Sequence, residues 1–258
     1  MSQGRVLIVA GSDSGGGAGV QGDIKTVTVL GGYAATAVTA ITVQNTLGVS
    51  DIHPLPPGLV AAQMLAVLAD IGADAVKLGM LGSAETIAAV ADVLESVTVP
   101  IVLDPVMVAK GDARLLPADA EAVLRERLIP MATLVTPNAP ELAALTGRAV
   151  TDVATALTAG RALMAATGTA VLIKGGHLDG AEVVDTLLTL DGEHTLRSPR
   201  QTTPHTHGTG CALASAVACG LAQGMALLPA AERAHAFVAA AIRAAPGLGK
   251  GHGPLGFQ

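Results

Sequence analysis

Short strand-like segments alternate with helix-like segments along most of this chain, and this alternation constrains the fold more than any other feature. The apolar run Val6–Ala10 is followed by a helix-like segment from Gln21 to Leu30, and Thr36–Gln44 is rich in β-branched residues, which favour strands. Further strands are expected at Ala75–Met80, Ile101–Val106, Leu134–Thr136 and Ala170–Ile173. Further helices are expected at Pro57–Asp70, Ala84–Ser96, Pro117–Ile129, Pro140–Leu145, Val153–Ala166, Cys211–Ala222 and Pro229–Ala244. The pattern predicts a mostly parallel sheet with helices on both faces.

A hairpin signal stands near the end of this series. Asp191-Gly192 lies between the strand-like segments Val183–Leu190 and Glu193–Leu196, which predicts an antiparallel addition at one edge of the sheet. Because no linker or internal repeat interrupts the chain, we expect one three-layer α/β/α domain over residues 1–258. A (β/α)₈ barrel fits the length, but the hairpin and the two closing helices fit it poorly.

The composition limits the partners of the chain. Half of the residues are apolar, the net charge is −6, and there are only two Phe, one Tyr and no Trp. Without a basic cluster or an aromatic surface, nucleic acid is not an expected partner. The apolar runs are broken before membrane-spanning length and no signal-peptide pattern begins the sequence, so a cytoplasmic protein is expected. Cys211 and Cys219 lie about 12 Å apart on one predicted helix, too far for a disulfide, and free thiols fit that compartment.

The segment from His205 to Cys211 predicts an anion-binding site. Gly208 and Gly210 allow a tight turn directly into the helix that follows. The first amides of a helix lack carbonyl partners and carry partial positive charge, which suits phosphate. Cys211 stands at the helix start, where we expect a lowered thiol pKa and a possible base. The same residues could equally form an ordinary loop-to-helix junction with a buried cysteine and no ligand.

Polar side chains follow several predicted strands. Ligands of an open α/β sheet bind at the carboxyl ends of its strands, so Asp104 is a candidate for Mg²⁺ and Lys174 for phosphate oxygens. Asn138 and Glu141 are candidates for polar contact with a metal–phosphate group, although they also match a helix capping box. Gln44 ends a strand too. Taken singly, each of these has an ordinary explanation as a turn, cap or solvated residue.

The glycine-rich segment Gly11–Gly19 suggests a loop whose backbone approaches a small ligand. The overlapping segment Gly17–Gly22 matches the letters of the dinucleotide-binding fingerprint. A dinucleotide site is nevertheless rejected, because the glycines begin too far from the strand and no acidic residue follows the second strand. His177, His205 and His207 do not have a zinc-site spacing and are interpreted as loop residues. The remaining histidines, His235 among them, look incidental.

Together the loops resemble one family. The segments that carry the resemblance are Gly11-Ser-Asp-Ser-Gly-Gly-Gly-Ala-Gly-Val-Gln, Thr42-Val-Gln-Asn, Lys77-Leu-Gly-Met-Leu, Leu103-Asp-Pro-Val-Met, Thr136-Pro-Asn-Ala-Pro-Glu, Lys174-Gly-Gly-His, Thr206-His-Gly-Thr-Gly-Cys and Gly249-Lys-Gly-His-Gly-Pro-Leu. In this order they closely resemble the hydroxymethylpyrimidine/phosphomethylpyrimidine kinases of thiamine biosynthesis, in the ribokinase-like superfamily. The resemblance covers nearly the whole chain.

The resemblance implies ATP-dependent phosphorylation of 4-amino-5-hydroxymethyl-2-methylpyrimidine and then of its monophosphate, with Mg²⁺, in a homodimer. It implies that the pyrimidine lies at Gln44, with Gly11, Asp23, Met80 and Val106 in or beside the pocket. Gly208, Thr209 and Gly210 would form the anion hole, and Cys211 would stand where related sugar kinases have a catalytic Asp. It further implies that Lys174, Asn138 and Thr206 contact ATP and that Asp104 and Glu141 organise Mg²⁺.

One departure from the family and three alternative functions remain open at this point. The segment from Ala109 to Asp112 lacks a Ser that usually stands between Lys110 and Gly111 of the family's flap, which puts flap closure in question. Pyridoxal kinases of the same superfamily are the alternative function, although no Cys lies between Met107 and Leu116, where those relatives carry a second one. Two alternatives come from other functional classes: a hydrolase with a Cys nucleophile, and a vitamin-binding protein with a decayed catalytic site.

Overall fold

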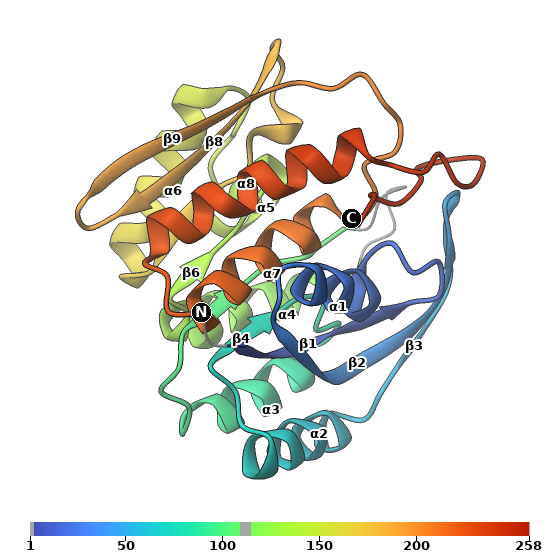
Figure 1. The fold of residues 1–258 in the computed structure, drawn as a ribbon. Coiled ribbons are helices and arrows are strands. Elements are labelled where there is room, and N and C mark those ends of the chain that lie inside the picture. Colours follow the sequence, from blue (N-terminus) through green and yellow to red (C-terminus); the bar gives the residue numbers. More distant parts are fainter. Residues whose placement is uncertain (1–2, 109–114, 258) are drawn as a thin grey trace.

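The strands of the computed structural model, which describes residues 3–108 and 115–257, form one nine-stranded sheet (Figure 1). Their order is β3-β2-β1-β4-β5-β6-β7-β8-β9. The bounds are β1 Arg5–Asp13, β2 Tyr33–Asn45, β3 Gly48–Pro54, β4 Ala75–Leu78, β5 Ile101–Leu103, β6 Leu134–Val135, β7 Ala170–Ile173, β8 Glu182–Thr189 and β9 Gly192–Pro199. In the order of the sheet, neighbouring strands from β2 through β1, β4, β5 and β6 to β7 pair in parallel. Strand β3 at one edge and strands β8 and β9 at the other are antiparallel additions. This open order confirms the α/β sandwich and excludes the barrel alternative.

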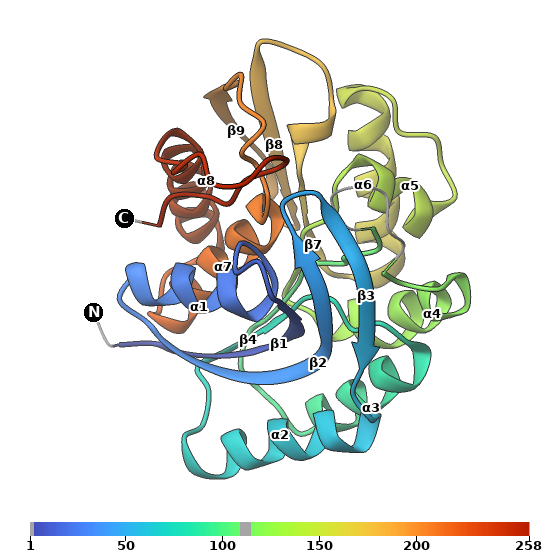
Figure 2. The same ribbon diagram turned by 90° about the vertical axis from the view of Figure 1, so that its right-hand side faces the viewer.

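Helices cover both faces of the sheet (Figure 2). On one face lie α2 Pro57–Asp70, α3 Ala84–Leu94, α4 Ala118–Val123, α5 Ala139–Thr146 and α6 Val153–Thr167, and on the other lie α1 Gly19–Val29, α7 Thr209–Ala222 and α8 Leu227–Arg243. Each face has its own apolar core, in which Leu7 and Leu103 point to one side and Ile8 and Val102 to the other. Because the central strands are buried on both faces, they are apolar without alternation, as parallel strands require.

Two elements differ from the expectation. Strand β3 was not expected, because its exposed edge position leaves polar residues such as Ser50, Asp51 and His53 in a segment without apolar alternation. The helix expected over Pro117–Ile129 is α-helical only as far as Val123 and continues as a π-turn, Leu124–Leu128, followed by a short 3₁₀ turn. The flap segment with Lys110 and Gly111 lies outside the described residues.

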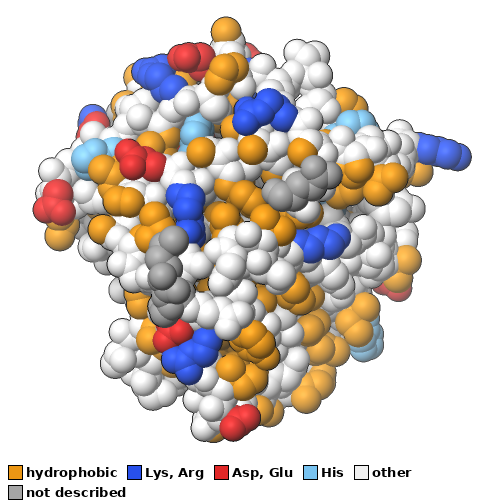
Figure 3. Space-filling view, in the orientation of Figure 1, with side chains coloured by type: hydrophobic (Ala, Val, Ile, Leu, Met, Phe, Trp, Pro, Cys, Tyr) orange, Lys and Arg blue, Asp and Glu red, His pale blue; other side chains and the backbone are white. Residues whose placement is uncertain are grey.

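The surface and the helices show two further features. On the face drawn in Figure 3, Lys and Arg side chains are scattered, some of them beside Asp or Glu, and do not form a continuous basic patch. Within residues 3–108 and 115–257, no helix combines the length and apolar character needed to cross a bilayer.

We expect the core beneath α2 to tolerate truncation poorly. Met64 is completely buried, whereas its neighbour Leu65 is 53% exposed on the same helix. Met64→Ala therefore leaves a cavity and should lower the free energy of unfolding by about 2–5 kcal/mol. The matched control Leu65→Ala should change it by no more than about 0.5 kcal/mol. Equal losses in chemical denaturation would contradict this packing of α2.

Candidate active site

A cavity of about 940 Å³ opens at the carboxyl ends of the parallel strands, above the start of α7. It brings together residues from positions 10 to 252, as expected where strands of an α/β sheet end. Of the predicted site residues, its wall includes Gly11, Gln44, Met80, Asp104, Val106, Asn138, Glu141, Lys174, Thr206, Gly208, Thr209, Gly210 and Cys211. Asp23 is the predicted site residue that does not line it.

The anion loop is shaped by a close approach of two glycine segments. Gly208 precedes α7 with a left-handed φ of 86°, and a Cβ there would lie 2.0 Å from the carbonyl oxygen of Gly17. Only glycine fits this position without moving the first glycine loop. The turn aims the first amides of the fourteen-residue helix α7 at the cavity, where their positive potential suits an anion.

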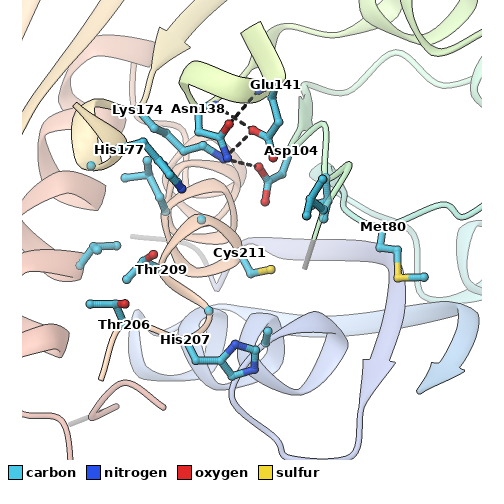
Figure 4. Close-up of a pocket in the computed structure, with 18 of the residues that line it drawn as sticks. Met80, Asp104, Asn138, Glu141, Lys174, His177, Thr206, His207, Thr209 and Cys211 are labelled. Carbon is cyan, nitrogen blue, oxygen red and sulfur yellow. Dashed lines mark hydrogen bonds and ion pairs between the residues drawn. The ribbon is translucent and has the colours of Figure 1, made fainter. Parts of the chain in front are cut away.

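A buried ionic cluster stands beside this helix end (Figure 4). Lys174 Nζ lies 2.7 Å from Asp104 Oδ1 and 3.3 Å from Glu141 Oε2. Burial alone would lower the pKa of Lys174, but Asp104 and Glu141 more than reverse this effect and raise it. The ammonium is thus charged and reaches the cavity from the end of β7.

Asn138 and Glu141 serve the helix as well as the cavity. Glu141 N donates to Asn138 Oδ1 over 2.9 Å, and Asn138 N donates to Glu141 Oε2 over 2.7 Å, so they form the capping box of α5. Burial raises the pKa of Glu141 to about 7, with Asp104 adding to the rise and Lys174 opposing it. The capping interpretation of these two residues is correct, and their place in the cavity wall leaves the ligand interpretation open.

The expectation of a lowered thiol pKa at Cys211 is wrong for the ligand-free protein. Burial raises the pKa of this thiol to about 12, and Asp23 and Asp104 add to the rise. The charge of Lys77 and the amide of Gly19 oppose it without cancelling it. The helix-end argument fails here because it counts only the helix dipole and ignores the loss of water around a buried sulfur.

Asp23 lies beneath the cavity and not in its wall. Its Oδ2 is 2.7 Å from Lys77 Nζ, and Ser215 Oγ donates to its Oδ1 over 2.7 Å. Asp23, Lys77 and Ser215 are all completely buried. Burial alone would lower the pKa of Lys77, but Asp23 offsets this and, with Cys211 and Asp104, raises it to about 12. Burial also raises the pKa of Asp23 against the effect of Lys77, and we place the proton on the amine, the stronger base. Direct contact of Asp23 with a pyrimidine is therefore not supported.

The pair Asp13–His207 joins the two loops in the wall of the cavity, and the sequence analysis did not predict it. His207 Nε2 lies 2.8 Å from Asp13 Oδ2, and both side chains are buried. The amides of Gly17 and Ala18 donate to the same carboxylate oxygen. Gln44 stands next to this pair, with its Oε1 accepting from Thr42 Oγ1 over 3.1 Å and its Nε2 3.5 Å from His207 Nε2. A motif search gives no signal for the pair, because 194 positions separate its members.

The oxygen ligands for a divalent cation are sparse. In the described part of the chain, no cluster of three or more His, Cys, Asp or Glu side chains could hold a metal alone. Asp104 and Glu141 nevertheless provide two hard carboxylates in one wall of the cavity. Mg²⁺ in phosphate-transfer sites is typically bound by one or two carboxylates together with substrate phosphates and water. The residues present fit that mode and do not form a closed metal cage.

Comparison with known families decides the classification. A family model described as phosphomethylpyrimidine kinase matches residues 13–256. The chain belongs to this kinase family. The resemblance inferred from the loop motifs is thereby confirmed.

Individual relatives agree with this assignment. A hydroxymethylpyrimidine/phosphomethylpyrimidine kinase of Haemophilus influenzae is 47% identical, over 97% of this chain and 95% of that protein. A thiamine biosynthesis bifunctional protein of Geobacter sulfurreducens is 53% identical over 98% of this chain, but the chain spans only 52% of its length. Among solved structures, an ADP complex of Bacillus subtilis pyridoxal kinase has a TM-score of 0.91 at 35% identity, covering 99% of this chain and 98% of that one.

The raised pKa of Glu141 predicts a pH-dependent stability. The folded protein binds this proton up to about pH 7, whereas the unfolded chain releases it near 4.5. The associated stability is present below about pH 4.5 and is lost as pH rises through 7, in total about 3 kcal/mol. Glu141→Gln, which keeps a capping-box side chain, should abolish this loss.

Urea denaturation between pH 4.5 and 8 measures the effect. The control is Glu232→Gln, which changes an exposed carboxylate on α8. As the pH rises, wild type and Glu232→Gln should lose the same amount of stability, whereas Glu141→Gln should not lose it. Parallel curves for all three proteins would show that Glu141 does not retain its proton.

Proposed function

We propose that this chain transfers the γ-phosphoryl group of ATP to the hydroxymethyl oxygen of 4-amino-5-hydroxymethyl-2-methylpyrimidine, and then a second group to the resulting monophosphate. The observation that carries the proposal is that the wall of one cavity includes Gln44, Met80, the start of α7 and Lys174. Relatives named for this activity are 43–49% identical over nearly the whole chain, which supports the same chemistry here.

The pyrimidine site is formed by a carboxamide and an apolar wall. The backbone of Gln44 is fixed by Ser14, which accepts from its amide and donates to its carbonyl oxygen. A carboxamide offers donors and an acceptor together, so it can meet a ring nitrogen and an exocyclic amine of an aminopyrimidine. Gly11 leaves room for Met80, whose sulfur lies 3.1 Å from the place of a Cβ. We assign Gly11, Gln44, Met80 and Val106 to substrate binding.

Phosphoryl transfer asks the protein mainly for position and for stabilisation of charge. The amides of Thr209, Gly210 and Cys211 begin α7 and lie in the cavity wall, where they can receive the transferring phosphoryl oxygens. Lys174 adds a full positive charge directly beside these amides, since a Cβ at Gly210 would lie 3.2 Å from its Nζ. We assign Lys174, Asn138 and Thr206 to ATP binding.

Asp104 and Glu141 are the residues that would hold Mg²⁺. When bound, the cation neutralises phosphate charge and the nearby carboxylates. The tight Lys174–Asp104 pair means that Asp104 has only part of its acceptor capacity free, since Thr136 Oγ1 also donates to Oδ1 over 3.3 Å. Its second oxygen, Oδ2, lies on the side of Gly210.

We assign Cys211 to take the substrate proton. In the ligand-free protein the thiol keeps its proton, because burial and two carboxylates outweigh Lys77. Neutralising Asp104 would remove one of those opposing charges. We therefore propose that the thiol becomes a competent base only in the loaded site.

Pyridoxal phosphorylation is the second candidate, because the pyridoxal kinase structure superimposes with a TM-score of 0.91. The aminopyrimidine is favoured, since the relatives named for it are more similar in sequence and Gln44 can pair with its amine. We further propose that the chain is a single kinase domain, because one sheet runs through it, and that it works as a cytoplasmic homodimer like its family.

The first test of this function concerns Cys211. Cys211→Ala should lower turnover by about 10²-fold, the usual effect of losing a general base. ATP binding should change little, because the backbone amides remain. Steady-state kinetics and direct nucleotide titration measure the two effects, with Cys219→Ala as the control for a buried thiol on the same helix. Near-normal turnover of Cys211→Ala would remove the thiol from the mechanism.

The second test concerns substrate choice. Gln44→Leu should reduce catalytic efficiency for the aminopyrimidine about tenfold to a hundredfold, because the ring loses its amide partner. Efficiency for pyridoxal, which has no such amine, should fall less. Measuring both substrates in both proteins gives the ratio. Equal proportional losses would mean that Gln44 shapes the pocket without recognising the amine.

A further inference from the structure

A buried carboxylate–imidazole pair stands in the cavity wall beside the turn that follows Lys174. Asp185 on β8 and His235 on α8 are 6% and 9% exposed, and both line the cavity. His235 Nδ1 lies 2.8 Å from Asp185 Oδ2. Because its partner is a carboxylate, Nδ1 carries the proton. The other ring nitrogen, Nε2, is buried and meets no hydrogen-bond partner of ordinary geometry among residues 3–108 and 115–257, although the backbone of Arg197 contributes to raising the pKa of the ring.

The second oxygen of Asp185 holds the backbone that follows Lys174. The amide of Gly175 donates to Asp185 Oδ1 over 2.8 Å. A Cβ on Gly175 would lie 2.1 Å from the carbonyl oxygen of Val184, so the turn is pressed against β8. Helix α8, strand β8 and the turn after Lys174 therefore meet at one carboxylate.

A second charged side chain holds the same loop from its other side. Arg200 donates to the carbonyl oxygens of Gly176 over 3.0 Å and of Gly180 over 2.8 Å. It also donates to the carbonyl oxygen of Leu178. The loop 175–182 is thus fixed by side chains at both ends, although it carries little regular structure of its own.

The walls around this loop suit the base of a nucleotide. Val183 on β8 and Val238 and Ile242 on α8 line the cavity, and these are the two elements that carry Asp185 and His235. An apolar slot with a few polar groups is the usual form of a site for a flat heteroaromatic ring. If the phosphates lie at α7 and Lys174, the nucleoside of ATP can lie against β8 and α8, because the turn after Lys174 is bonded to Asp185 on β8.

We propose that Asp185 and His235 are positioning residues that hold the turn after Lys174 in the conformation that binds ATP. The inference rests on the proposed function, because it takes this part of the cavity as the nucleotide site. Neither residue touches the reacting atoms. Asp185 holds the amide of Gly175 and thereby fixes the backbone from which Lys174 reaches Asp104. His235 ties α8, which forms one wall of the slot, to the same carboxylate.

The test compares substrate affinities in substituted proteins. His235→Leu removes the donor to Asp185 and should raise the KM for ATP about tenfold, with the KM for the pyrimidine unchanged. His235→Asn places a donor near the position of Nδ1 and should restore most of the ATP affinity. His53→Leu, which changes an exposed histidine on β3, is the control and should leave both values as in wild type.

ADP titration of the same proteins, without an acceptor substrate, separates this inference from the function itself. Weaker ADP binding by His235→Leu supports the pair even if another acceptor proves correct. Equal rises in both KM values, or wild-type ADP affinity in a destabilised His235→Leu, would reduce the pair to a structural role. Should His235→Leu fail to fold, Asp185→Asn applies the same test, with ADP binding at least about threefold weaker expected and wild-type affinity contradicting the proposal.

Discussion

The ion pair between Lys174 and Asp104 is the interaction on which the site depends. A largely buried ammonium needs carboxylates beside it, and here two converge on Nζ, Asp104 from the end of β5 and Glu141 from the first turn of α5. The pair connects β5, α5 and β7 at the edge of the sheet where the strands end. The positive charge of Lys174 and the negative charge of Asp104 nearly cancel. The site therefore suits a phosphate group that binds together with a cation.

The rest of the cavity is arranged around that balance. Directly below it, Lys77 and Asp23 form a second pair that is completely closed to solvent. Cys211 lies between the two pairs and is influenced by both, which explains why its thiol keeps its proton in the ligand-free protein. The backbone contribution comes from α7, whose start is held in place by the close approach of Gly208 to the first glycine loop.

Much of this could be predicted from sequence, because the motifs report on backbone geometry. The alternation gave the parallel strands, and the strand-end positions of Asp104 and Lys174 brought them to one cavity. The burial of individual side chains could not be predicted. Burial raises the pKa of Cys211 where the sequence predicted a lowered one, and Asp23 is buried beneath the pocket where a place in its wall was expected. Long-range pairs were also beyond reach, since His235 looks incidental until the fold places Asp185, fifty positions away, beside it. The edge strand β3 has no apolar pattern by which to find it.

The most direct test of the account is to incubate the protein with ATP, Mg²⁺ and the aminopyrimidine alcohol, and to follow the products over time by mass spectrometry. A parallel reaction contains pyridoxal in place of the pyrimidine. We predict that the pyrimidine monophosphate appears first and is then converted to the diphosphate, and that the pyrimidine is used more efficiently than pyridoxal. Phosphorylation of pyridoxal alone, or nucleotide hydrolysis without transfer to either alcohol, would contradict it.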